Sequence, residues 1–60
     1  MKLGKLLNLM DPLHDIKIFM VGEDGFCYEG RKEDVTKELL NVSVVSFHAF
    51  EDIISVLVQK

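Results

Sequence analysis

The stretch Asp15–Glu29, DIKIFMVGEDGFCYE, predicts a β-hairpin and decides the fold. Alternate residues from Ile16 to Met20 are apolar, which is the period of a strand with one buried face. Phe19 and Val21 are apolar as well, so the second face of this strand is expected to be covered or to lie beside a partner. Asp24-Gly25 separates two apolar runs, and this pair favours a hairpin because glycine adopts a positive φ without strain.

A second hairpin is predicted near the end of the chain. Val42–Phe50 is an alternating, β-branched and aromatic run that is typical of a strand. Ile53–Val58 has the same pattern. Glu51-Asp52 is the only polar pair between the two runs and therefore predicts a tight turn. With Phe26–Glu29 as the returning strand of the first hairpin, the sequence contains four strands.

The N-terminal segment predicts a short helix. Leu3, Leu6, Leu7 and Met10 are spaced as i, i+3, i+4 and i+7, so all four lie on one helix face. Pro12 is expected to end this helix, because the residue before a proline avoids the α region.

A second short helix is predicted over Val35–Leu40. Asp34 precedes it and has the side chain of an N-cap residue. Val35 and Leu39 are expected to face inward. Asn41 is expected to end the helix in the left-handed conformation. A helix of about two turns has little stability of its own, so packing must hold it in place.

These elements predict one α+β domain over residues 1–60, in the order αββαββ. We expect both hairpins to join in one small antiparallel, four-stranded sheet with the two short helices on one face, because an amphipathic helix and a half-apolar sheet must bury each other. The opposite face would carry Phe19, Val44 or Leu57, depending on the register. An apolar face of that kind would favour a homodimer.

Composition narrows the classes of protein. The net charge of −3 disfavours nucleic-acid binding, which usually needs a basic surface. The lone Cys27 cannot form an internal disulfide, so a reducing cytoplasm is the expected location. Asn8 and Asp11-Pro12 interrupt the first apolar run, which argues against a signal peptide, and no run is long enough for a membrane span.

No motif for catalysis or cofactor binding occurs in the sequence. His14, Cys27 and His48 are the only soft metal ligands, and their spacing does not require a zinc site. Cys27 and His48 would form a nucleophile and base only beside an orienting group and a substrate cleft. We therefore expect no catalytic residue, no metal and no cofactor.

Acidic residues occupy both predicted hairpin tips. Glu23 and Asp24 lie in the first, and Glu51 and Asp52 lie in the second. If the two tips share one end of the sheet, the four carboxylates would form a surface for a basic site on a partner. The alternative is that they keep a small domain soluble, which is the usual role of surface charge.

Four stretches together resemble short, mostly uncharacterised proteins encoded by phages and prophages of Gram-positive bacteria. They are Leu6-Leu7-Asn8-Leu9-Met10-Asp11-Pro12, Val21-Gly22-Glu23-Asp24-Gly25, Tyr28-Glu29-Gly30 and Asp34-Val35-Thr36-Lys37-Glu38-Leu39-Leu40-Asn41. The resemblance covers nearly the whole chain. It implies a phage or mobile-element origin and an accessory role, and it brings no catalytic residues. Val35-Thr36 departs from the proline expected at the start of the second helix.

Three functions follow as hypotheses. The first is an accessory protein that binds a protein partner, as an inhibitor of a host or defence protein, through a sheet face, an edge strand or the acidic tips. The second is a nucleic-acid-associated regulatory module that stacks bases on Phe19, Phe26 or Tyr28, as four-stranded sheets can do. The third is a structural or assembly protein of a virion.

Overall fold

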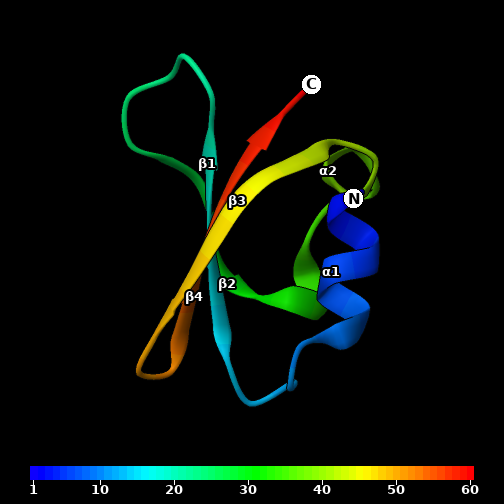
Figure 1. Cartoon of the computed structure of the whole chain (residues 1–60). Helices are drawn as coiled ribbons and strands as arrows, with labels where there is room; N and C mark the ends of the chain where they lie inside the picture. Colours follow the sequence, from blue (N-terminus) through cyan, green and yellow to red (C-terminus); the bar gives the residue numbers. More distant parts are fainter.

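A computed structural model describes all 60 residues, with a four-stranded sheet and both helices on one of its faces (Figure 1). The elements follow in the order α1 (Leu3–Leu9), β1 (Asp15–Met20), β2 (Phe26–Arg31), a 3-10 turn η1 (Lys32–Asp34), α2 (Lys37–Leu40), β3 (Ser43–Phe50) and β4 (Ile53–Gln59). The predicted α+β class and order of elements are confirmed. Neither helix has the length or the apolar character that a membrane-spanning helix needs.

The strands lie in the order β2-β1-β4-β3. Both hairpins, β1 with β2 and β3 with β4, are antiparallel, as predicted. The central pair, β1 with β4, is parallel and runs in continuous register from Asp15↔Ile53 to Met20↔Val58. The sheet is therefore mixed, and the expectation that it is antiparallel throughout is wrong for its central pair.

The segment that joins the two hairpins explains the parallel pair. Residues 32–42 leave the end of β2, carry Val35 into the core and form α2 at the opposite end of the sheet (Figure 1). The chain therefore begins β3 in the same direction as β2. A connection of about a dozen residues is what a parallel crossover requires, whereas a tight turn would have produced an antiparallel pair.

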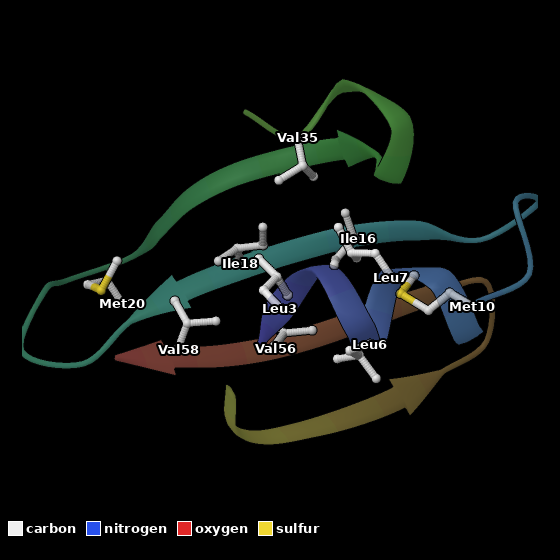
Figure 2. Packing of buried hydrophobic residues seen from close by; sticks show 10 residues of the cluster. All are labelled: Leu3, Leu6, Leu7, Met10, Ile16, Ile18, Met20, Val35, Val56 and Val58. Carbon is white, nitrogen blue, oxygen red and sulfur yellow. The ribbon is translucent and has the colours of Figure 1, made fainter. Parts of the chain in front are cut away.

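The core lies between α1 and the two central strands (Figure 2). Ile16 and Ile18 of β1 and Val56 and Val58 of β4 have no exposed surface, and Leu3 of α1 is also fully buried. Ten residues are buried in all, and every one is apolar: Leu3, Leu6, Leu7, Met10, Ile16, Ile18, Met20, Val35, Val56 and Val58. The predicted helix face and the predicted inner face of β1 are confirmed.

Side chains from outside α1 complete its C-terminal end. The ammonium of Lys32 donates hydrogen bonds to the carbonyls of Leu7 and Met10, each at 2.8 Å. The last carbonyls of a helix lack an N–H partner from the next turn. Lys32, which is distant in the sequence, supplies a hydrogen-bond donor to them instead. Beyond the helix, the Asp11 carboxylate accepts the backbone N–H of Leu13 at 2.9 Å, which fixes the turn around Pro12.

The second helix differs from its prediction. It begins at Lys37 instead of Val35, and Asp34 belongs to the preceding 3-10 turn. Val35 is extended and buried between the two. Asn41 ends α2 with a φ of −96° and is right-handed, so the expected left-handed cap is wrong. The backbone N–H groups of Asn41 and Val42 instead donate to the carbonyl of Leu39.

The one-sided core makes a direct prediction for stability. Replacing Ile18 with Val removes one methylene from a site with no exposed surface. The free energy of unfolding should fall by about 0.5–1.5 kcal/mol. Ile53→Val is the matched control, because Ile53 is 40% exposed on the opposite face, and its effect should be clearly smaller. Urea unfolding followed by circular dichroism measures both, and equal losses would contradict the placement of the core.

Candidate functional site

The face of the sheet opposite the helices carries no covering element, and we call it the open face (Figure 1). Its residues alternate with the buried ones along the two central strands, and the strand registers place them in three rows across the sheet. The rows are Phe26, Phe19, Leu57 and Ser46; then Glu29, Lys17, Ser55 and His48; then Arg31, Asp15, Ile53 and Phe50.

Phe26, Phe19 and Leu57 of the first row form an apolar cluster. Phe19 and Phe26 meet edge to face, with ring centroids 6.5 Å apart and planes at 85°. Leu57 is the register partner of Phe19 on β4. Phe26 is 50% exposed, whereas Phe19 and Leu57 are half-buried by their neighbours in the row. Edge-to-face contact is a favoured aromatic geometry, so the cluster has a defined shape before any partner binds.

The second row is polar and electrically balanced. The ammonium of Lys17 lies 3.2 Å from a carboxylate oxygen of Glu29 and 5.0 Å from the ring centroid of Phe26. The ion pair and the aromatic ring hold the lysine along the face instead of leaving it extended into solvent. Ser55 and His48 continue the row toward the β3 edge. The middle of the open face therefore offers hydrogen-bonding groups with little net charge.

The third row ends in a second apolar pair. Ile53 and Phe50 are register partners at the end of the second hairpin, and their exposed fractions are 40% and 68%. The open face thus consists of two apolar clusters at its two ends with a polar row between them. Of the residues that we expected here, Phe19 and Leu57 lie on this face, whereas Val44 pairs with buried Val58 on the helix side.

The acidic tips lie at opposite ends of the sheet. Glu23 and Asp24 follow the end of β1, whereas Glu51 and Asp52 precede the start of β4. Because β1 and β4 run in parallel, the end of one strand cannot meet the start of the other, and Figure 1 shows the two tips far apart. The four carboxylates therefore do not form one cluster, although each pair remains exposed.

The residues considered for metal or nucleophile chemistry are also separate. Cys27 is on β2 and His48 is on β3, the two opposite edge strands, and both are exposed. His14 lies in the loop before β1. No group of three or more metal-ligating side chains comes together.

A shallow cleft lies on the helix side, beneath the junction of α1 and η1. Its volume is about 410 Å³, and seven residues line it: Gly4, Leu7, Asn8, Lys32, Glu33, Val35 and Leu40. Lys32 is the one basic side chain among them, and its ammonium is already engaged by two helix carbonyls. The surface of the cleft is mainly apolar, and Asn8 and Glu33 are its other polar side chains.

Tyr28 lies on the helix side of β2, opposite Ile18, and not with Phe19 and Phe26. Its hydroxyl donates to the carbonyl of Arg31 at 2.6 Å. Partial burial raises the pKa of the Tyr28 phenol, and the negative charges of Asp34, Asp15 and Glu33 raise it further. Gly30, at a φ of +152°, lies under this ring, and a Cβ there would meet the hydroxyl at 3.0 Å. Tyr28 is therefore a structural side chain of the β2 edge.

Sequence reasoning missed the third row of the open face. Phe50 and Ile53 flank the predicted turn, and the alternation along both strands puts them on one face, but only the packing of the helices shows which face is uncovered. No protein-family model, no curated protein and no solved structure matches this chain.

Tyr28 gives a pH-dependent prediction. Its raised pKa means that folding favours the protonated phenol, so this contribution to stability is present below pH 10, the ordinary pKa, and is lost as the pH rises through the higher value of the folded state. Tyr28→Phe should lower the free energy of unfolding by about 0.5–1.5 kcal/mol at pH 7 by removing the bond to Arg31. The difference between the two proteins should shrink above pH 10.

The measurement is direct because Tyr28 is the only tyrosine. Ultraviolet difference absorbance of the folded protein reports its ionisation, and urea unfolding at several pH values reports the stability. A phenol that titrates at or below pH 10 in the folded protein would contradict the assignment.

Proposed function

We propose that this chain is a small protein-binding accessory protein of phage or mobile-element origin, and that the open face is its contact surface. The observation that carries the proposal is the one-sided core. All ten buried residues lie on the helix side of the sheet or on the helices and connection that cover it, and exposed aromatic and aliphatic side chains occupy the uncovered side. The resemblance to short phage proteins supports the accessory role.

The composition of the open face supports binding over simple solvation. A sheet face that stays in water usually carries polar residues at alternate positions. Here three aromatic residues, Phe19, Phe26 and Phe50, stand at such positions, together with Ile53 and Leu57. Clusters of exposed apolar side chains of this kind are typical of interaction sites.

The arrangement also indicates the chemistry of the partner. Two apolar clusters separated by a nearly neutral polar row match a surface with two apolar contacts and hydrogen-bonding groups between them. Aromatic residues that become buried in an interface commonly contribute much of the binding energy. The acidic tips are secondary in this proposal, because a partner would have to reach both ends of the sheet to contact all four carboxylates.

The nucleic-acid alternative has one observation in its favour, the placement of Phe19 and Phe26 beside Lys17 on an open sheet face. Base stacking on such a platform is usual in single-strand binding. Three observations weigh against it: Glu29 pairs with Lys17, Tyr28 lies on the other side of the sheet, and the net charge is −3. A virion role would also use exposed apolar surface, and it predicts incorporation into particles.

The test is affinity capture of tagged protein from a lysate of the bacterial host, with mass spectrometry as the readout. Phe26→Ser and Phe50→Ser each remove one exposed ring from the open face, and each should reduce recovery of a stoichiometric protein at least tenfold. Leu13→Ser is the matched control, because Leu13 is 86% exposed but lies in the loop before β1. It should leave recovery unchanged.

Parallel arms separate the alternatives. Recovery that disappears after nuclease treatment would replace the proposal with the nucleic-acid function. Loss of the partner with Glu23→Lys or Asp52→Lys, but not with Phe26→Ser, would move the contact to a hairpin tip. A partner that is retained by both open-face variants would contradict the proposal.

A further inference from the structure

The second half of β3 is an unprotected sheet edge. Its outer side is covered only at the start, where Leu3 donates its N–H to the carbonyl of Val42 at 2.9 Å and Met1 accepts the N–H of Val44 at 2.8 Å. From Val45 to Phe50 no segment of the chain lies alongside it. This half of the edge contains no proline, glycine, lysine, arginine, aspartate or glutamate.

The opposite edge, β2, is protected. A bulge interrupts its pairing near Phe26, and Gly30 and the charged residues Glu29 and Arg31 lie along it. The hydroxyl of Tyr28 also occupies the carbonyl of Arg31. Bulges, charges and covered carbonyls are the devices by which proteins prevent edge pairing. β3 has one bulge, at Val45, and none of these devices from Ser46 to Phe50.

Two residues of this half present their backbone groups outward. The carbonyls of Asp52, just before β4, and of Val58, within it, accept the N–H groups of Asp15 and Val21, so the alternate positions between them also face β1. The remaining positions, 53, 55 and 57, face β3 and pair with residues 50, 48 and 46. The N–H and carbonyl groups of Phe47 and Ala49 therefore point away from the sheet.

We propose that this edge binds a second copy of the same chain, with the two β3 strands antiparallel about a two-fold axis at His48. Phe47 of one copy then exchanges hydrogen bonds with Ala49 of the other, and the same pair forms again on the other side of the axis. On the opposite face of the strand, Ser46 lies across from Phe50. Every phenylalanine thus meets a small residue, so the strand is complementary to itself in shape.

Charge also favours self-pairing. The stretch from Ser43 to Phe50 has no lysine, arginine, aspartate or glutamate, so a two-fold axis brings no like charges of these residues together. Phe47 and Phe50, which are 56% and 68% exposed in the single chain, would both lose exposure. The product is a continuous eight-stranded sheet, whose interface is small and whose dissociation constant is expected in the micromolar range or weaker.

Sedimentation velocity over a hundredfold range of protein concentration tests this inference. The unaltered chain should shift from monomer to dimer. Ala49→Pro removes one outward N–H, which an edge strand tolerates, and should leave a folded monomer by circular dichroism. Ala49→Ser, the matched control, keeps the N–H and should dimerise normally. If Ala49→Pro fails to fold, Ala49→Lys takes its place as the test. It keeps the backbone N–H but puts a charged side chain at the edge, so it should also give a folded monomer.

The outcomes are distinct from those of the proposed function. Phe26→Ser changes the open face at the far edge and should leave the dimer intact. Mixed samples of labelled and unlabelled chains should show magnetisation transfer between the Phe47 ring and the Ala49 methyl group of the other copy. A chain that stays monomeric at every concentration, or a dimer that persists in both Ala49→Pro and Ala49→Lys, would overturn the inference.

Discussion

The parallel pairing of β1 with β4 is the constraint on which the other elements depend. It places Ile16 beside Ile54, Ile18 beside Val56 and Met20 beside Val58, so the apolar positions of both strands face the same side. Only α1 and the connection through Val35 then cover that side. In a chain of 60 residues there is enough apolar surface to build one such layer, and a domain of this size has little further surface to bury.

The open face and the free edge are consequences of the same pairing. Because β1 pairs with β4 in the middle of the sheet, the other strand of each hairpin, β2 and β3, becomes an edge. The segment from β2 to β3 must cross the helix side to return to the starting end, so no part of the chain remains for the other side. The proposed partner and the proposed second copy therefore use surfaces that the fold leaves uncovered.

Much of the fold follows from local patterns in the sequence. The spacing of Leu3, Leu6, Leu7 and Met10 predicts the buried face of α1, and the alternation from Ile16 to Met20 predicts the buried face of β1. Each buried face follows from the side-chain period of a single helix or strand, so no knowledge of its neighbours is needed. The pairing of strands within each hairpin was also predictable, because the short turns at Asp24-Gly25 and Glu51-Asp52 place the two flanking strands side by side.

The direction of the second hairpin relative to the first was not predictable from such patterns. It depends on where the connecting segment ends, and the burial of Val35 outside any helix is decided by the packed core and not by local preference. The wrong prediction of an antiparallel central pair also affected the predicted binding site. An antiparallel central pair would have brought Glu23 and Asp24 to the same end as Glu51 and Asp52, whereas the parallel pair separates them. The apolar residues of the open face were visible in the sequence, but their exposure depends on which face of the sheet the helices cover.

The strand direction can be measured directly in solution. Methyl-labelled protein gives magnetisation transfer between side chains that are adjacent on the helix side of the central strands. The parallel pairing predicts contacts from Ile16 to Ile54 and from Met20 to Val58. An antiparallel centre would instead connect Ile16 to Val58 and Met20 to Ile54, and that pattern would contradict the account.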